Sequence, residues 1–270
     1  MLLFWILLTV VVCFFLYLYM IMPNTSRRSK ILPYLKRDYA HRGLHDSSRL
    51  IPENSMPAFR EAVKQNLAIE LDIHLTRDGI VVFHDESLKR ICNAEGTVEN
   101  STFDTLQHLH LSGTSEHMPL FSDVLRYVNG RVPLLIELKL PDSNMKLCPA
   151  AWDILKDYKG PYMVQSFNSL GIRWFHKHAP QVLRGQLSSA LTRTNPENPF
   201  LARFCVQFLL TNLICRPDFI SYKHAGNPSV WLNHYLYRIP MAVWTLRNQK
   251  VYKTARNKYD MYIFEGFSVK

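Results

Sequence analysis

Acidic side chains stand two residues apart inside apolar runs of this sequence. Glu70 and Asp72 alternate with branched apolar residues in segment 68–73, and Glu137 and Lys139 alternate in the same way in a second apolar run. Because residues i and i+2 of a strand point to the same side, each pair presents its charged groups together. Carboxylates gathered in one apolar environment repel one another unless a cation joins them. Oxygen ligands of this kind suit Mg²⁺, Ca²⁺ or Mn²⁺ better than zinc.

A simpler interpretation is that each carboxylate forms an ion pair with Arg42 or Lys139. For any one carboxylate taken alone, that interpretation is the better one. For Glu70, Asp72 and Glu137 together at the ends of strands, we expect metal ligation.

Two of the eleven histidines adjoin further polar groups at the ends of predicted strands. His41 is followed by Arg42, and His84 is followed by Asp85. Cleavage of a phosphodiester requires one proton to leave the attacking oxygen and another to reach the leaving oxygen, and two imidazoles can do both near neutral pH. Arg42, Lys139 and a cation would neutralise the phosphate. We therefore expect an acid/base pair here and interpret the other nine histidines as ordinary core or surface residues.

The elements that must position these residues alternate between short apolar runs and helical stretches, which is typical of a parallel α/β architecture. Eight strands are expected, the number that a closed (β/α)₈ TIM barrel needs, with the polar residues at the carboxyl ends where such barrels build their sites. The expected strands are 39–43, 68–73, 132–139, 163–167, 183–188, 218–223, 241–246 and 261–266. The expected helices are 55–65, 120–129, 146–158, 168–178, 198–213, 229–237 and 247–258.

The segment after the second strand does not fit a parallel crossover. Asp78-Gly79 lies between two extended runs in segment 73–85, which is a hairpin signal, and the connection is too short for a parallel return. We therefore predict a β-hairpin there, followed by a small insertion over residues 86–119 at the mouth of the barrel.

The first 22 residues contain no charged side chain and are long enough to cross a bilayer as a helix. The alternatives are a cleaved signal peptide or a buried core helix. No basic residue precedes the run and no small-residue cleavage site follows it, whereas Trp5, Tyr17 and Tyr19 suit the membrane interface. We expect a transmembrane anchor over 1–22, a polar linker over 23–37 and a single barrel domain over 38–270.

Basic residues follow the predicted span and none precedes it, which predicts a cytoplasmic catalytic domain. The five cysteines show no zinc-like spacing and are expected to be free thiols. A net charge of +10 fits an anionic membrane surface or a phosphate-bearing substrate. No nucleic-acid-binding motif accompanies the charge, so we do not expect nucleic acid as a partner. No obligate protein partner is indicated.

Segment 204–215, FCVQFLLTNLIC, is apolar but too short to span a bilayer. We expect it to be a barrel helix that packs on the core. The alternative is a helix that dips into the membrane surface and lets the barrel reach lipid substrates.

Taken in order, these motifs resemble the signature of the glycerophosphodiester phosphodiesterase family, with bacterial members that carry an N-terminal membrane segment as the most similar in character. The resemblance covers roughly residues 38–267 and is densest in the first half. Its residues are His41-Arg42-Gly43, Pro52-Glu53-Asn54-Ser55 with Ala58-Phe59, Ile69-Glu70-Leu71-Asp72, Thr76-x-Asp78-Gly79, His84-Asp85, Glu137-Leu138-Lys139, Gln165-Ser166-Phe167 and Trp244-Thr245.

The resemblance implies a metal-dependent hydrolase that converts a glycerophosphodiester into sn-glycerol 3-phosphate and an alcohol. It also implies a role for each matching residue. These roles are acid/base catalysis by His41 and His84, ligation of Ca²⁺ or Mg²⁺ (with Mn²⁺ also suitable) by Glu70, Asp72 and Glu137, phosphate binding by Arg42 and Lys139, and shaping of the site by Glu53, Asn54 and Trp244.

The sequence departs from the family pattern in its last strand, where Glu265 stands in place of a usual aspartate. We expect this departure to affect the pocket for the alcohol rather than the catalytic set. Two alternative enzymes remain within the family, a lysophospholipase D acting on membrane lipid and a lyase that forms a cyclic phosphate. A catalytically inactive, membrane-tethered binding module is the alternative from another class, and the presence of both histidines and all three carboxylates argues against it.

Overall fold

The computed structural model of the chain describes residues 1–141, 144–194, 199–223 and 227–269. Eight parallel strands form a closed ring in the order β1-β9-β8-β7-β6-β5-β4-β2, and the pairing of β1 with β2 closes it. This is the predicted TIM barrel. The strands are β1 (Arg37–Ala40), β2 (Ala68–Leu75), β4 (Leu134–Leu138), β5 (Tyr162–Ser166), β6 (Leu183–Ser188), β7 (Phe219–Lys223), β8 (Met241–Leu246) and β9 (Met261–Phe264).

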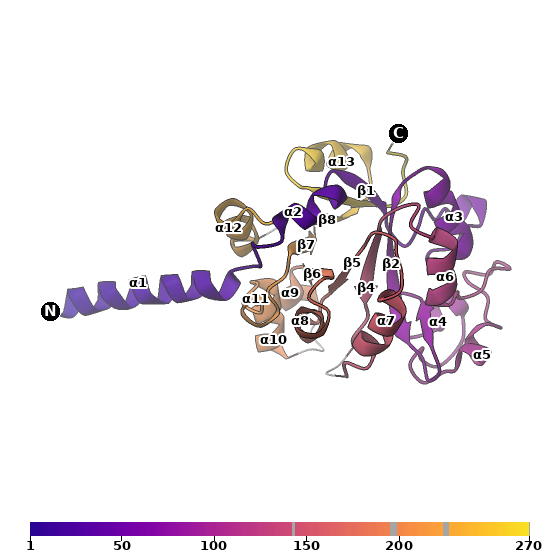
Figure 1. The fold of residues 1–270 in the computed structure, drawn as a ribbon, viewed down its shortest axis with the longest axis horizontal. Helices are drawn as coiled ribbons and strands as arrows, with labels where there is room; N and C mark the ends of the chain where they lie inside the picture. The colour runs from indigo at the N-terminus through magenta and orange to yellow at the C-terminus, as the bar shows by residue number, and fades with distance from the viewer. Residues whose placement is uncertain (142–143, 195–198, 224–226, 270) are drawn as a thin grey trace.

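The helices that surround the barrel agree with the predicted ones to within a few residues at most ends (Figure 1). They are α3 (Met56–Lys64), α6 (Phe121–Val128), α7 (Leu147–Leu155), α8 (Ser169–His178), α12 (Pro228–Tyr237) and α13 (Gln249–Arg256). Most of them present an apolar stripe to the sheet, as amphipathic helices on a barrel must.

The prediction of one continuous helix over 198–213 is wrong, because the helix is interrupted. Its first residue lies outside the described part of the chain, and the rest is divided into α10 (Phe200–Gln207) and α11 (Asn212–Cys215). Leu209 between them has a φ of 60°, in the left-handed region that a right-handed helix cannot contain. A short α9 (Leu191–Thr194) precedes α10, so the described part of the β6–β7 connection contains three helical pieces.

The hairpin predicted after the second strand is present. β3 (Ile80–Val82) pairs antiparallel with β2, and Asp78 lies in the turn. The insertion that follows contains α4 (Lys89–Cys92) and α5 (Phe103–Leu106) and has an apolar cluster of its own, which includes Val81, Phe83 and Ile91. This cluster holds the insertion as a packed unit beside the carboxyl ends of the strands.

Segment 23–37, predicted as a polar linker, packs against the amino end of the barrel. Ile31, at the end of α2 (Arg28–Ile31), is fully buried among side chains from inside the barrel such as Tyr39 and Phe219. Arg27 forms an ion pair of 3.1 Å with Asp218 at the start of β7. The segment therefore closes one end of the barrel, opposite the end that carries the polar residues.

The N-terminal helix α1 (Leu2–Ile21) projects away from the barrel (Figure 1). It is long and apolar enough to cross a membrane, a property that membrane anchors and signal sequences share. Its inner end is attached to the barrel, because Asn212 donates a hydrogen bond of 2.8 Å to the carbonyl of Ile21 and Tyr237 donates one of 2.9 Å to that of Leu18.

Candidate active site

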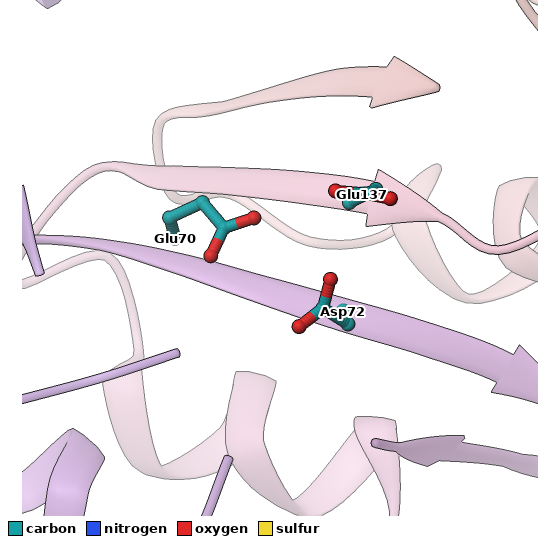
Figure 2. Close-up of side chains that lie close together, drawn as sticks. All are labelled: Glu70, Asp72 and Glu137. Atoms are coloured by element: carbon teal, nitrogen blue, oxygen red, sulfur yellow. The ribbon is translucent and has the colours of Figure 1, made fainter. Parts of the chain in front are cut away.

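Three buried carboxylates meet where β2 and β4 run side by side. Asp72 on β2 lies directly opposite Glu137 on β4, and Glu70 precedes Asp72 by two residues on the same face. One oxygen from each carboxylate lies within 4.8 Å of the others, and Figure 2 shows the three groups gathered between the two strands. The predicted set is therefore assembled by strand register as well as by local spacing.

The ion-pair interpretation accounts for two of these carboxylates and not for the third. The Nζ of Lys139 lies 3.0 Å from Asp72 and 2.5 Å from Glu137. Among the described residues, no lysine or arginine side chain lies within 4.0 Å of the carboxylate of Glu70, which accepts hydrogen bonds from the backbone N–H of Arg42 and from Gln165. Glu70 is the group whose charge lacks compensation.

The acid–base equilibria of the three groups reflect this arrangement. Burial together with the neighbouring Asp72 and Glu137 raises the pKa of Glu70 well above its ordinary value. Burial also raises the pKa of Glu137, against the opposing effect of Lys139. Burial alone would raise the pKa of Asp72, but Lys139, His84 and Arg42 hold it far below its ordinary value. A divalent cation among the three oxygens would relieve the repulsion that raises the pKa of Glu70, so the residues fit such an ion.

His41 follows the end of β1 and is oriented by a residue from the end of the barrel sheet. Its Nδ1–H donates to the carboxylate of Glu265, which in turn accepts a hydrogen bond of 2.5 Å from the Nε of Arg247. The Nε2 of His41 lies 4.0 Å from Glu70 and faces the carboxylates. We expected Glu265 to affect the pocket for the alcohol. The structure corrects this expectation, because the side chain of Glu265 contacts His41, one of the two predicted acid/base residues.

His84 is held in the same manner from the opposite side of the site. Its Nδ1 is 2.6 Å from Asp85, which accepts hydrogen bonds of 2.6 and 2.8 Å from Arg90. The carbonyl of His84 is 3.1 Å from the Nε2 of the buried His74. Each histidine thus has an arginine-bound carboxylate on Nδ1, which leaves Nε2 as the ring nitrogen without a carboxylate hydrogen bond. Burial lowers the pKa of both His41 and His84 below the ordinary value.

The turn after β1 explains why a glycine follows Arg42. Arg42 and Gly43 have φ values of 55° and 78°. A Cβ on Gly43 would lie 2.8 Å from the Cβ of Ala58 on α3, closer than atoms pack. The turn directs the backbone N–H of Arg42 at Glu70 and the guanidinium of Arg42 toward Asp72, with the Arg42 Nε 3.6 Å from the carboxylate.

Glu53 and Asn54 lie behind this turn. The Nδ2 of Asn54 donates a hydrogen bond of 2.8 Å to Asp72, and Glu53 accepts bonds of 2.6 Å from Arg42 and 2.8 Å from Arg90. Glu53 therefore connects the Arg42 side of the site to the Arg90 side. Both residues contact the predicted ligand and phosphate-binding residues rather than the open cavity.

The cavity at this centre has a volume of about 130 Å³ and is lined by most of the predicted site residues. Trp244 on β8 and Phe167 after β5 form one wall, with ring centroids 5.7 Å apart. A second cavity of about 310 Å³ adjoins it on the side of His84, lined in part by His74 and Glu86. The structure thus brings His41, Arg42, Glu70, His84, Glu137, Lys139 and Trp244 together around one cavity.

Sequence reasoning missed four residues of this arrangement. Glu265 was assigned to another pocket, His74 was grouped with the ordinary histidines, and Arg90 and Arg247 were not singled out. The i, i+2 spacing of His74 from Asp72 on β2 was the one local signal available. The contacts of Glu265 with His41 and of Arg90 with Glu53 join residues 224 and 37 positions apart in the sequence, so no periodic pattern marks them.

Comparison with known proteins agrees with this geometry. Residues 41–270 match the glycerophosphoryl diester phosphodiesterase family. YhdW of Bacillus subtilis is 33% identical over 166 residues, which cover 58% of this chain and 65% of that protein. A glycerophosphodiester phosphodiesterase of Caldanaerobacter subterraneus is 32% identical over 164 residues, which cover 55% of this chain and 65% of that protein. The chain therefore matches just under two thirds of the length of these relatives.

Solved structures share the fold. A phosphodiesterase of Oleispira antarctica, determined in complex with the product sn-glycerol-3-phosphate, has a TM-score of 0.69 with 21% sequence identity. The similarity covers 86% of this chain and 94% of the Oleispira chain.

Proposed function

Because this chain belongs to the glycerophosphoryl diester phosphodiesterase family, we propose that it is a phosphoric diester hydrolase that converts glycerophosphodiesters into sn-glycerol 3-phosphate and an alcohol. The observation that carries the proposal is the pair of imidazoles, His41 and His84, each with a carboxylate on Nδ1 and both lining the cavity of the acidic cluster. The sn-glycerol-3-phosphate bound by the Oleispira relative supports the product assignment.

In this mechanism the chain binds the phosphate with two cations and moves two protons. Arg42 and Lys139 line the cavity, so their positive charges would offset the negative charge of a phosphate bound there. The Nε2 of one histidine takes the proton from the attacking oxygen as its bond to phosphorus forms. The other histidine protonates the alcohol oxygen as its bond to phosphorus breaks.

Glu70, Asp72 and Glu137 are the proposed ligands of a divalent cation, Ca²⁺ or Mg²⁺, with Mn²⁺ also suited to oxygen ligands. Such an ion supplies positive charge that stabilises the phosphate as negative charge develops on it. Glu53, Asn54 and Trp244 shape the site in this proposal, through their contacts with Arg42, Asp72 and Phe167 respectively.

We further propose that α1 is a retained membrane anchor and that residues 38–270 form the catalytic domain on the cytoplasmic side. The absence of charge from 1–22 and the basic residues that follow support this assignment. The attachment of α1 to the barrel through Asn212 and Tyr237 also supports it, because that attachment keeps the barrel close to the point where the helix would enter the bilayer.

The test is release of glycerol 3-phosphate from glycerophosphocholine and glycerophosphoethanolamine by the full chain in detergent. The protein is first treated with EDTA and then supplied with Mg²⁺, Ca²⁺ or Mn²⁺. Metal-dependent release of open glycerol 3-phosphate is expected, and a cyclic phosphate product would favour the lyase instead. If no metal restores turnover of either substrate or of a lysophospholipid, the inactive binding module becomes the better assignment.

A further inference from the structure

An apolar groove of about 630 Å³ begins at the wall of the catalytic cavity and runs outward between α8 and α10–α11. Phe167, Trp244 and Lys223 line both the groove and the catalytic cavity. Beyond them half of the lining side chains are aliphatic, including Leu170 on α8 and Val206 on α10, and most of the others are small polar residues. Its volume is in the range of about 300–1,000 Å³ that small-molecule ligands occupy in proteins.

The catalytic cavity is too small to hold a whole lipid. Its volume of about 130 Å³ suits a phosphate with part of the glycerol, and its lining carries most of the charged groups. A substrate with an acyl chain on its glycerol must place that chain elsewhere. The groove is continuous with the cavity at Phe167 and Trp244, and its aliphatic and aromatic side chains, more than half of the lining, offer such a chain apolar contacts.

The helices that line the groove, α8, α10 and α11, lie on the side of the barrel from which α1 departs (Figure 1). Ile214 of α11 lines the groove, and in the same short helix Asn212 is bonded to the carbonyl of Ile21. Arg216, which follows α11, donates a hydrogen bond of 2.7 Å to the carbonyl of Met22. One helical turn is therefore shared by the wall of the groove and the base of the proposed anchor.

Large apolar side chains are exposed around this end of the groove. Phe200 and Leu201 of α10 are 62% and 71% exposed, and Phe204, Leu213 and Ile214 are each more than one third exposed. A cluster of this kind on a soluble surface marks a contact with lipid or protein. Because α11, which carries part of this cluster, is bonded to the base of a helix that is apolar along its whole length, lipid is the contact that suits both features.

We infer that this groove binds the acyl chain of a lysophospholipid that enters from the membrane. This inference rests on the proposed phosphodiesterase function and names the substrate class of that function. Water supplies the oxygen that bonds to phosphorus, and the bond from phosphorus to the head-group oxygen breaks. The head-group alcohol leaves with a proton, and the acylated glycerol phosphate remains in the groove until release. Deacylated glycerophosphodiesters bind at the same centre without filling the groove.

The experiment measures choline release by the full chain in lipid nanodiscs. The substrates are glycerophosphocholine and lysophosphatidylcholines that carry butanoyl, hexanoyl or octanoyl chains. Each buried methylene should raise kcat/KM about fourfold until the groove is filled. The readout is the ratio of kcat/KM for the octanoyl substrate to that for glycerophosphocholine within each protein, so it does not depend on the absolute activity of a variant.

Val206→Trp fills the groove and should lower this ratio at least about tenfold. Lys177→Trp, at an exposed position of α8 that lies outside both the groove and the apolar cluster, is the matched control and should keep the ratio of the unmodified chain. If all chain lengths are hydrolysed equally by the unmodified protein, the acyl-binding role is overturned and the phosphodiesterase function stands. If the preference persists unchanged in V206W, the chain is bound elsewhere, and membrane partitioning explains the preference. If neither class of substrate is hydrolysed, the proposed function itself fails.

Discussion

The Nδ1–H of His41 donates a hydrogen bond to the carboxylate of Glu265, a residue 224 positions away at the end of the last barrel strand. This contact fixes the orientation of the imidazole and selects the tautomer whose Nε2 can accept a proton. His84 obtains the same orientation from its immediate neighbour Asp85. The two halves of the proposed acid/base pair are therefore supported by one long-range and one local carboxylate.

Replacing the long-range partner should change both rate and pH dependence. Glu265→Gln removes a negative charge that raises the pKa of His41, so the pKa of His41 should fall further below its ordinary value. The limb of the kcat/KM profile governed by His41 should move to lower pH, and kcat should fall about 10–100-fold. Steady-state kinetics across pH tests this; an unshifted profile would exclude Glu265 as the partner that matters.

Removing either proposed acid/base residue should have a larger effect. His41→Ala and His84→Ala should each lower kcat by roughly 10²–10⁴-fold while leaving the fold intact. His178→Ala, at the exposed end of α8, is the matched control and should retain full activity. Near-normal turnover by either site variant would remove that histidine from the mechanism.

Glu70 should determine metal dependence because, among the described residues, it is the carboxylate of the three with no lysine or arginine side chain within 4.0 Å. Glu70→Gln should raise the concentration of Mg²⁺ or Ca²⁺ needed for half-maximal activity by more than about tenfold. Glu61→Gln on α3, which changes the same chemical group on the outside of the barrel, should leave that concentration unchanged. Metal titration of the EDTA-treated proteins measures both, and equal metal requirements would contradict the ligand assignment.

The segment that closes the amino end of the barrel should contribute to stability. Ile31→Ala leaves a cavity among fully buried side chains and should lower the free energy of unfolding by about 2–5 kcal/mol. Leu32→Ala, one residue later and 58% exposed, should change it by less than about 0.5 kcal/mol. Denaturant unfolding of the full chain in detergent compares the two. Equal stability of both variants would show that the packing of residue 31 is dispensable.

Local spacing accounts for what could be predicted from the sequence. Glu70 and Asp72 share a face because side chains alternate along a strand, and Asp78-Gly79 indicates a hairpin because these turn-forming residues lie between two extended runs. The same alternation of strand and helix signals predicted the eight-stranded barrel, whose strands were located to within about three residues. The break at Leu209 was not predictable, because no glycine or proline marks it and the buried position of Leu209 in the core depends on the tertiary structure.

Only the tertiary structure decided which distant residues meet. The register of β2 against β4 sets Asp72 opposite Glu137, and closure of the ring between β1 and β9 brings Glu265 to His41. The course of the β6–β7 connection sets the groove beside α1. These contacts depend on how the whole sheet closes, and the free energy of closure is shared among many strand pairs. No short stretch of sequence contains that information. The sequence therefore predicted which residues could carry the chemistry, and only the tertiary structure gave their arrangement.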